Sequence, residues 1–379
     1  MKTSVNIIRI LVGILFIVSG LVKANDPLGL SYKMQEFFEI WNASLPSSSF
    51  LINIFSSLHE YSLALSIIMI TLEIMAGTAL LIGWKKKPVL YLLLFLIIFF
   101  TFLTAYAYGS GKFKNCGCFG DCLPITPLTS FLKDVILLVL IIFLLIQQRY
   151  IQPLFTERRQ IIALTATLLF TTCLQWYVLN YLPLVDCLPF KVGNNITEQM
   201  KIPANAVPDS FVMKFIYEKG GKRFEFNTTE LPADLETYKF IDRTEKLIRK
   251  GNAEPPIKGF SLTGASGSDS TSAILEAPKT VLLFTEHFKN PLTSWINDLK
   301  DINEKAKSKG TPVLLVTANA TAAKNMLAQN GLADIPVFSC DNIAVRTAAR
   351  TNPTIFLLQK GTISDKYSYR RIDKLKQKL

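Results

Sequence analysis

Five long apolar runs occupy the first half of the chain, and they limit its possible folds more than any other feature. A helix needs roughly 20 apolar residues to cross a bilayer, and each run approaches or reaches that length. The runs are residues 6–22, 61–82, 89–108, 128–146 and 161–182. We therefore predict a membrane all-α bundle of about five transmembrane helices in contact with the lipid bilayer, followed by a soluble part.

The first run has an alternative interpretation as a cleaved signal peptide. The segment Val22-Lys23-Ala24 is a poor cleavage site, Arg9 interrupts the apolar run, and four more runs follow. These features favour a retained helix.

Charged residues between the runs indicate the orientation of the bundle. Basic residues gather at the connections that would share one side of the membrane: Lys2, Lys85, Lys86, Lys87, Arg149, Arg158 and Arg159. Because cytoplasmic connections are enriched in Lys and Arg, we expect the N-terminus in the cytoplasm and residues 23–60, 109–127 and 183–379 outside it. This predicts a multi-pass protein of a bacterial inner membrane with a periplasmic C-terminal domain.

The net charge of +12 does not indicate a nucleic-acid partner. In the second half of the chain the basic residues are interleaved with acidic ones, and in the first half they cluster at helix ends. A mildly basic domain beside an anionic membrane surface explains the charge more simply.

Two charges lie inside the predicted spans and need partners. Glu73 is near the middle of the second span, and Arg9 is about one turn into the first. A lone carboxylate in hydrocarbon is costly, so it should be paired, protonated or exposed to a polar cavity. One interpretation is an Arg9–Glu73 ion pair that fixes helix packing, and the other is a proton or headgroup site for a quinone.

Three cysteines, Cys116, Cys118 and Cys122, lie within seven residues of the connection between the third and fourth spans. A fourth, Cys187, follows the fifth span and is expected on the same side of the membrane. Thiol–disulfide exchange needs an accessible thiolate and a nearby resolving sulfur. We therefore predict that Cys116 and Cys118 form a redox pair, with Cys122 and Cys187 as a resolving or structural pair.

Two other interpretations of the cysteines stay open. A static Cys122–Cys187 disulfide would fasten the loop to the end of the fifth span, and it can coexist with an active Cys116/Cys118 pair. Three thiolates with Asp121 or Cys187 could hold zinc. The lack of a Cys-x-x-Cys pair and of a nearby histidine argues against that site, so no metal is expected.

These residues resemble the MauE branch of the DoxX-like membrane proteins. The resemblance covers most of residues 1–150, and its most specific element is the loop Cys116-Gly117-Cys118-Phe119-Gly120. Other matching positions lie in or beside the first, second and fourth spans: Arg9, Ser19, Gly20, Lys23, Glu73, Gly77, Gly83, Thr126, Pro127, Lys133 and Asp134. Cys122 and Cys187 fall outside the family pattern.

The resemblance implies a small helical bundle comparable with quinone-linked disulfide-forming enzymes of the vitamin K epoxide reductase type. MauE members are associated with maturing the disulfide-rich methylamine dehydrogenase, and other DoxX relatives with thiosulfate:quinone oxidoreduction. It thus implies periplasmic redox work, with quinone as the expected cofactor.

The soluble half is predicted to begin with an α+β extension over residues 190–278. Residues 211–217 and 222–227 form a predicted hairpin around Lys219-Gly220-Gly221, a strong turn signal. An amphipathic helix is expected over residues 235–249. The predicted domains are a four-helix bundle (1–150), the fifth transmembrane helix and linker (151–189), this extension, and an α/β domain (279–379).

In residues 279–379, strands at 281–285 and 313–317 alternate with helices at 292–307 and 321–329. A final hairpin at 354–358 and 362–367 follows residues 337–338 and a short helix. This order resembles a thioredoxin fold of the membrane-tethered TlpA type, and Pro353 stands where that family carries its cis-proline. The expected Cys-x-x-Cys is missing, with Glu286-His287 near its place. Cys340 is expected to be a buried core thiol and His287 a solvated loop residue.

The whole chain also resembles two-part DoxX proteins of the Bacteroidetes group, which join such a bundle to a degenerate thioredoxin-like domain. Two functions remain open. One is a quinone-linked thiol–disulfide oxidoreductase acting on periplasmic protein thiols. The other is a non-enzymatic subunit or scaffold of an envelope protein complex, with structural disulfides. A metal or solute transporter is disfavoured, because the spans carry too few polar residues to line a path.

Overall fold

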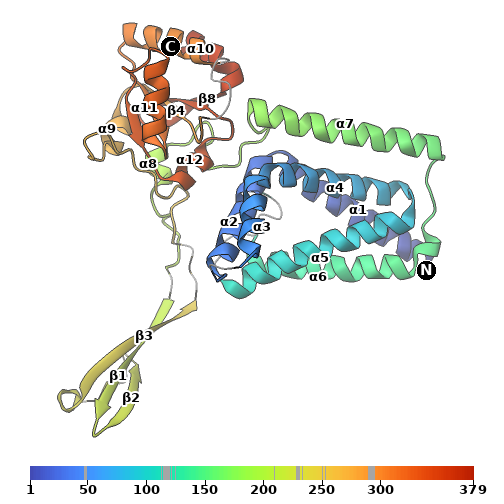
Figure 1. Cartoon of the computed structure of the whole chain (residues 1–379). Helices are drawn as coiled ribbons and strands as arrows, with labels where there is room; N and C mark the ends of the chain where they lie inside the picture. Colours follow the sequence, from blue (N-terminus) through green and yellow to red (C-terminus); the bar gives the residue numbers. More distant parts are fainter. Residues whose placement is uncertain are drawn as a thin grey trace.

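The computed structural model describes most of the chain: residues 1–46, 49–111, 113, 120, 122–123, 125–208, 210–227, 231–232, 234–249, 251, 253–288 and 295–379. Among these residues, five helices are long and apolar enough to cross a membrane: α1 (Lys2–Ala24), α4 (Ser62–Ile82), α5 (Lys86–Ser110), α6 (Pro127–Ile146) and α7 (Glu157–Tyr181). They correspond to the five predicted spans. The chain is therefore a multi-pass membrane protein, and its long helices run side by side in Figure 1.

Close backbone contact between α1 and α4 depends on glycine. A Cβ atom on Gly77 would lie 2.9 Å from the carbonyl oxygen of Gly13, and one on Gly13 would lie 2.5 Å from Leu81 Cδ2. Without side chains at these positions the two helices approach closely, as small residues allow within membranes.

Two helices that the sequence did not indicate occupy the predicted connection at residues 23–60. They are α2 (Pro27–Ala43) and α3 (Leu51–Glu60), which form a helical hairpin across one end of the bundle (Figure 1). Asp26 caps α2 by accepting a hydrogen bond from the Gly29 amide at 3.0 Å, and Pro27 occupies the first turn. Phe37 stacks on Phe113 with ring centroids 4.1 Å apart, which anchors α2 to the chain after α5.

A five-stranded sheet forms the centre of the C-terminal domain, in the order β6-β5-β4-β7-β8. Its strands are β4 (Thr280–Phe284), β5 (Val313–Thr317), β6 (Val337–Ser339), β7 (Thr354–Gln359) and β8 (Thr362–Ser368). β4, β5 and β6 are parallel, and β7 and β8 are antiparallel to their neighbours. The order β5-β4-β7-β8 is that of a thioredoxin fold, so the predicted fold class is confirmed and we call this the thioredoxin-like domain.

Helices cover both faces of this sheet. They are α8 (Ile196–Gln199), α9 (Thr271–Glu276), α10 (Ile296–Ser308), α11 (Ala320–Gln329), α12 (Asn342–Ala348) and α13 (Leu375–Lys378). Alternate residues of each strand point to opposite faces, so Leu283 packs in one core with α10 and α11, while Leu282 and Phe284 pack in the other. The chain also contains short 3₁₀ helices. They are η1 (Gln148–Tyr150) between α6 and α7, η2 (Leu235–Thr237) between β2 and β3, and η4 (Tyr369–Lys374) after β8.

The core that holds Phe284 also takes in Phe190, Ile196, Ile257 and Leu275. These residues belong to the segment 190–278, which the sequence assigned to a separate extension. Both ends of that segment are therefore built into the thioredoxin-like domain.

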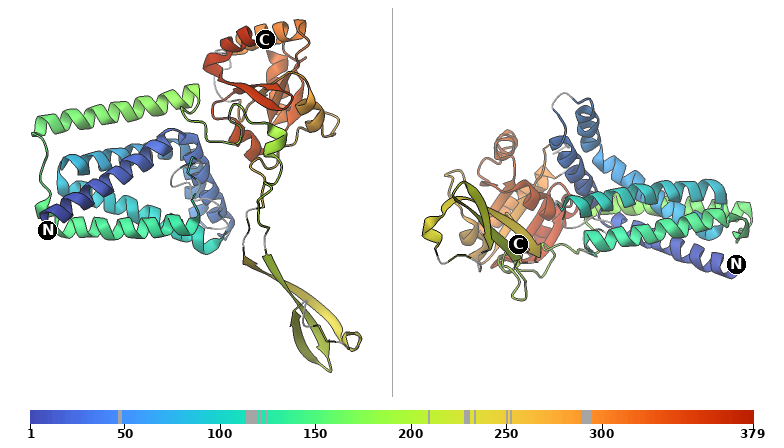
Figure 2. Two further views of the ribbon diagram at one scale, coloured as in Figure 1. Left: turned by 180° about the vertical axis from the view of Figure 1, so that it is seen from behind. Right: turned by 90° about the horizontal axis from the view of Figure 1, so that it is seen from below.

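Only the middle of that segment stands apart, as a three-stranded sheet of order β2-β1-β3. The predicted hairpin is confirmed as β1 (Ser210–Lys219) and β2 (Lys222–Asn227). The predicted helix at 235–249 is wrong, because those residues form η2 and the strand β3 (Lys239–Arg249), which pairs along the open edge of β1. The left view of Figure 2 shows this sheet projecting away from the rest of the molecule.

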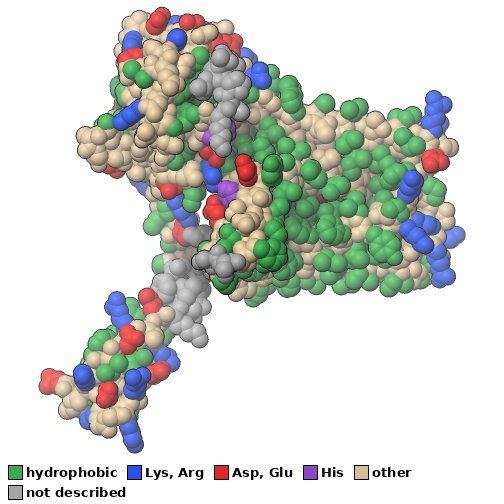
Figure 3. Space-filling model, viewed as in Figure 1, with side chains coloured by type: hydrophobic (Ala, Val, Ile, Leu, Met, Phe, Trp, Pro, Cys, Tyr) green, Lys and Arg blue, Asp and Glu red, His purple; other side chains and the backbone are tan. Residues whose placement is uncertain are grey.

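The outer surface of the bundle separates apolar from basic side chains. Hydrophobic groups cover its visible flank in Figure 3, while Lys and Arg gather at the end that lies away from the thioredoxin-like domain. The opposite end carries α2, α3 and the linker to that domain (Figure 1).

Candidate functional site

The predicted redox pair, Cys116 and Cys118, lies outside the described residues, as does Asp121. Two described positions show where the flanking chain runs. Phe113 is buried against α2, and Gly120 lies against Val22 at the end of α1. The cysteine-containing segment thus begins and ends at the end of the bundle that faces the thioredoxin-like domain.

Cys122 and Cys187 are joined by a disulfide across 65 residues of sequence. Cys122 precedes α6, where the Thr126 side chain caps the helix by accepting from the Thr129 amide at 3.3 Å. Cys187 lies in the linker that leads from α7 to the thioredoxin-like domain. The pairing that the sequence suggested is present, and whether this bond is structural or resolving remains a prediction.

The linker around Cys187 is held by polar contacts on both sides. Asn25 and Val185 exchange two hydrogen bonds, from the Asn25 amide group to the Val185 carbonyl at 2.8 Å and from the Val185 amide to Asn25 Oδ1 at 3.0 Å. Asp186 pairs with Lys366 of β8 at 2.9 Å. Burial lowers the pKa of the Lys366 ammonium, and the nearby Asp186 carboxylate acts in the opposite direction. The disulfide is thus tied both to α1 and to the thioredoxin-like domain.

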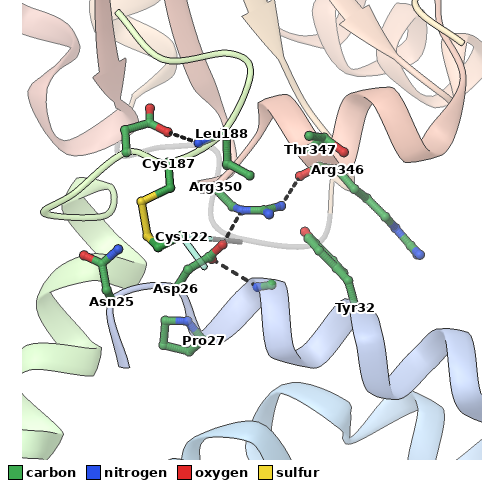
Figure 4. Close-up of polar contacts among 12 residues, drawn as sticks. Asn25, Asp26, Pro27, Tyr32, Cys122, Cys187, Leu188, Arg346, Thr347 and Arg350 are labelled. Atoms are coloured by element: carbon green, nitrogen blue, oxygen red, sulfur yellow. Dashed lines mark hydrogen bonds and ion pairs between the residues drawn. A yellow bond between two sulfur atoms is a disulfide. The ribbon is translucent and has the colours of Figure 1, made fainter. Parts of the chain in front are cut away.

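A charged network joins the membrane part to the thioredoxin-like domain beside this disulfide. We call it the junction, and it consists of Asp26 and Tyr32 of the membrane part with Glu286, Arg346 and Arg350 of the domain. Arg350 Nε lies 2.8 Å from Asp26 Oδ2, and the Tyr32 hydroxyl donates to Glu286 Oε2 at 2.7 Å. Arg346 Nε lies 3.0 Å from Glu286 Oε1. Figure 4 shows Arg350 reaching to Asp26, with the disulfide nearby.

The junction residues are largely shielded from solvent. The Arg350 and Asp26 side chains are 4% and 15% exposed, so their ion pair is screened little by water. Both guanidinium groups lie over the Tyr32 ring, at 5.3 Å for Arg346 and 5.5 Å for Arg350. Burial raises the pKa of the Tyr32 hydroxyl well above its usual value, and the Glu286 carboxylate reinforces this.

The domain side of the junction is the edge where a thioredoxin would carry its dithiol. Glu286 and His287 follow β4, and the peptide bond between Asn352 and Pro353 is cis, as expected for the family's proline position. Asn352 Oδ1 accepts from the Glu286 amide at 2.8 Å, and its Nδ2 donates to the His287 carbonyl at 2.6 Å. His287 is therefore half-buried and held against the proline loop, in contrast to the solvated residue that was expected.

Within the bundle, the predicted Arg9–Glu73 ion pair is wrong. Glu73 pairs with Lys23, whose Nζ lies 2.7 Å from Oε2. Arg9 instead donates to three backbone carbonyls, those of Leu80, Leu81 and Gln152. Residues near the C-terminal ends of helices have such free carbonyls, so Arg9 joins the end of α4 to the connection before α7.

The Lys23–Glu73 pair borders a small polar cavity of about 20 Å³, close to the volume of one water molecule. Ser19, Phe100 and Asp134 also line it, and Lys23 Nζ lies 4.4 Å from the centre of the Phe100 ring. Asp134 accepts a hydrogen bond from Thr104 at 3.1 Å and pairs with Lys133 at 2.5 Å. This arrangement can hold a water molecule or a similarly small polar group at the C-terminal end of α1.

Among the residues that the structure describes, no group of three or more His, Cys, Asp or Glu side chains is placed to hold a metal. The zinc interpretation needed the thiolates of Cys116, Cys118 and Cys122 with Asp121 or Cys187. Cys116, Cys118 and Asp121 lie outside that part of the chain, and Cys122 and Cys187 are joined in a disulfide. Cys340 is buried, as expected, and burial raises the pKa of its thiol to about 11, so it remains protonated.

Residues 1–147 match the family model described as methylamine utilisation protein MauE. The membrane part is of the MauE type. The matched segment covers α1 to α6, and thus the Lys23–Glu73 pair, the predicted redox cysteines and Cys122. Residues 211–250, which contain the three-stranded sheet, match a separate model described as a domain of unknown function, DUF8463.

Two individual proteins are similar to parts of the chain. Protein TlpB of Flavobacterium psychrophilum is 27% identical over 148 residues, which make up 36% of this chain and 35% of the relative. The chain therefore spans about a third of that relative's length. The second is the C-terminal domain of a protein described as a thiol-disulfide oxidoreductase from Bacteroides thetaiotaomicron. It is 17% identical, covers 32% of this chain and 93% of its own, and has a TM-score of 0.25. That score does not establish a common fold, so the thioredoxin-like assignment rests on strand order.

Sequence reasoning missed several residues of this site. Asp26, Tyr32, Arg350 and Lys366 were not singled out from the sequence, and Lys23 was noted only in the poor cleavage site and as a position of the family resemblance. A signal was present in Asp26-Pro27, which is a helix-start pattern and predicts α2. Nothing in the sequence indicated that α2 would meet the thioredoxin-like domain.

Proposed function

We propose that this protein takes part in thiol–disulfide exchange at the extracytoplasmic face of the membrane, with its cysteine loop as the reacting element. The observation that carries the proposal is the Cys122–Cys187 disulfide at the end of the MauE-type bundle. Cys118 lies only four residues before Cys122, and four residues of chain reach at most about 14 Å. The chain likewise keeps Cys116, six residues before Cys122, within about 21 Å of it, so two more cysteines lie near a disulfide that is already formed.

The chemistry proposed is a relay of two electrons and two protons. A partner protein dithiol becomes a disulfide as a Cys116–Cys118 disulfide is reduced to two thiols, with Cys122–Cys187 able to pass the electrons by the same exchange. The electrons need an acceptor in the membrane, and a quinone would supply one by taking up two electrons and two protons as the protein disulfide is restored. The cavity beside Lys23 and Glu73 has a volume of only about 20 Å³, so in this structure it does not fit a quinone headgroup.

The proposed location is a bacterial inner membrane with the cysteine loop and the thioredoxin-like domain in the periplasm. Support comes from the basic side chains, which gather at the bundle end opposite that domain (Figure 3). It also comes from the disulfide itself, because disulfides persist in oxidising compartments and are rare in the cytosol. The five described spans also support this orientation, because an odd number of crossings would put the two ends of the membrane part on opposite sides.

The test is a thiol-state measurement on the full-length protein in membranes. Cysteines are trapped with a maleimide of known mass after treatment with oxidised or reduced quinone, and each peptide is identified by mass spectrometry. We expect Cys116 and Cys118 to change state with the quinone, and Cys116→Ser to abolish the change. Cys173, an exposed cysteine on α7 that forms no disulfide, is the matched control. Cys116 and Cys118 that stay in one state under both treatments would exclude this function.

A second candidate is a non-enzymatic scaffold of an envelope complex. It is favoured by the thioredoxin-like domain, which lacks a dithiol and is instead fixed to the membrane part by the junction. In that case Cys116→Ser with Cys118→Ser leaves the cellular role intact, whereas loss of Cys122 or Cys187 lowers stability. The same variants thus distinguish the two functions.

A further inference from the structure

The edge of the thioredoxin-like domain that would bind substrate is occupied by the protein's own membrane part. Glu286 stands at the dithiol position, and the Asn352 side chain next to the cis-proline holds it there. Tyr32 of α2 donates to Glu286 at 2.7 Å, and Arg350 at the end of α12 reaches Asp26 before α2 at 2.8 Å. Among the described residues, Glu286 and Arg350 of this edge are therefore engaged by the membrane part.

The contacts are those of a specific interface. Arg350 Nη1 also donates to the Arg346 carbonyl at 2.7 Å, so its guanidinium is held by the domain as well as by Asp26. Next to this interface, Tyr369 donates to Asn180 at 2.8 Å and Arg371 donates to the Tyr177 hydroxyl at 3.1 Å, both at the end of α7. The domain is thus held at the α1–α2 corner and at α7.

The disulfide acts on the same interface through the linker. It fastens Cys187 to the segment before α6, and the neighbouring Asp186 pairs with Lys366 in β8, which is only 3% exposed. Asn25, next to Asp26, holds Val185 of the linker by two hydrogen bonds. Breaking the disulfide removes the covalent restraint on a linker whose other contacts position the domain over Asp26 and Tyr32.

We infer that the former substrate-binding edge of the thioredoxin-like domain is an intramolecular docking surface for the α1–α2 corner, and that docking is coupled to the redox state of Cys122–Cys187. The coupling is reciprocal by linkage: if the disulfide favours docking by some factor, docking favours the disulfide by the same factor. A partner dithiol that is oxidised to a disulfide gives up two electrons and two protons, converts Cys122–Cys187 to two thiols and thereby loosens the domain. This inference holds whether or not Cys116 and Cys118 are redox-active.

The test measures the midpoint potential of Cys122–Cys187 in the full-length protein in nanodiscs. Mixtures of reduced and oxidised dithiothreitol set the potential, since the dithiol becomes a cyclic disulfide as it gives up two electrons and two protons. Mass spectrometry of alkylated peptides reports the thiols. Arg350→Ala removes the Asp26 contact, and each tenfold loss of coupling makes the disulfide easier to reduce by about 30 mV. We expect Arg350→Ala to reduce the coupling between docking and the disulfide at least about tenfold.

Lys376→Ala is the matched control, because Lys376 pairs with Asp298 and Asp301 within the domain and contacts no membrane residue in these pairs. If Arg350→Ala fails to fold, Tyr32→Phe removes only the hydroxyl contact with Glu286 and should shift the potential in the same direction. Equal potentials in the wild type and in the folded junction variants would overturn the inference.

The reciprocal measurement uses hydrogen exchange. In Cys122→Ser we expect amides of α12 and of residues 27–34 to exchange about tenfold faster or more, while the amides of β4 and β5 keep their rates. Unchanged exchange in α12 would overturn the coupling, and faster exchange throughout the sheet would show unfolding of the domain in place of undocking.

Discussion

Lys23 Nζ lies 2.7 Å from Glu73 Oε2 and 2.9 Å from Oε1, and both side chains are almost completely buried inside the helix bundle. The pair joins α1 to α4 one turn before Asp26, the residue that meets the thioredoxin-like domain. A charge pair in this environment is costly to separate, because neither partner can recover its hydration.

Replacement of Glu73 by Gln should therefore lower stability. The change keeps the shape and leaves the Lys23 ammonium unpaired, which we expect to cost about 3–5 kcal/mol. Denaturant unfolding of the purified protein in detergent measures it. Glu36→Gln is the matched control, since the Lys33–Glu36 pair is partly exposed and should contribute less than about 1 kcal/mol. Equal stability of Glu73→Gln and the wild type would contradict the buried pair.

Replacing either Cys122 or Cys187 should lower the stability of the protein by the same amount, because each change removes the same disulfide. Cys122→Ser, Cys187→Ser and the double variant all remove one bond across 65 residues, for which chain entropy suggests about 4 kcal/mol. Thermal unfolding under oxidising conditions should place the three variants together, well below the wild type and below Cys173→Ser. Three different stabilities would mean that the cysteines have other partners.

Two glycine-to-alanine changes should act in opposite directions. Gly77→Ala places a methyl group 2.9 Å from the Gly13 carbonyl oxygen and should destabilise the bundle by about 1–3 kcal/mol. Gly109→Ala, in α5, meets no atom within 4 Å and should stabilise it by up to about 1 kcal/mol. Unfolding in detergent measures the change in stability for each variant. If both variants were destabilised, the close crossing of α1 and α4 at Gly77 would not explain the effect of Gly77→Ala.

Docking of the thioredoxin-like domain should weaken at high pH. Burial keeps the Tyr32 hydroxyl protonated in the docked state, whereas a free tyrosine ionises near its usual pKa of about 10. The docked state then binds more protons than the undocked one, so docking is unaffected below about pH 10 and declines above it. Hydrogen exchange of α12 from pH 8 to 11, corrected for its intrinsic pH dependence, should show the decline.

Tyr32→Phe is the control for this prediction. It has no proton to lose at position 32, so the additional decline above pH 10 should be absent from it. The same decline in both proteins would assign the effect to lysine deprotonation elsewhere.

The sequence sufficed for the spans because hydrocarbon admits so few backbone arrangements. It also sufficed for the succession of strands and helices along the chain after residue 279, where buried runs such as Val313–Thr317 alternate with helices. It suggested the Cys122–Cys187 pair from membrane sidedness alone.

The sequence does not show which charged residue of α1 pairs with Glu73. Arg9 and Lys23 both lie in α1, and only the crossing with α4 at Gly13 and Gly77 decides which one reaches Glu73. β3 was mistaken for a helix because its charges are evenly spread, and its pairing with the open edge of β1 overrides local preference. The junction joins residues more than 250 positions apart, as in Tyr32 and Glu286, so no local pattern marks it.

The chain leaves the thioredoxin-like domain near Pro208 and returns near Gly251, which lie against each other. None of the described residues of the sheet between them belongs to either core of that domain, and the sheet extends away from it (left view of Figure 2). An appendage joined at a single point can be lost, replaced or diversified by evolution without disturbing the folding of its host. The sequence of this segment is therefore expected to evolve independently of the thioredoxin-like domain. Residues 208–251 should keep their fold when they are grafted onto another domain.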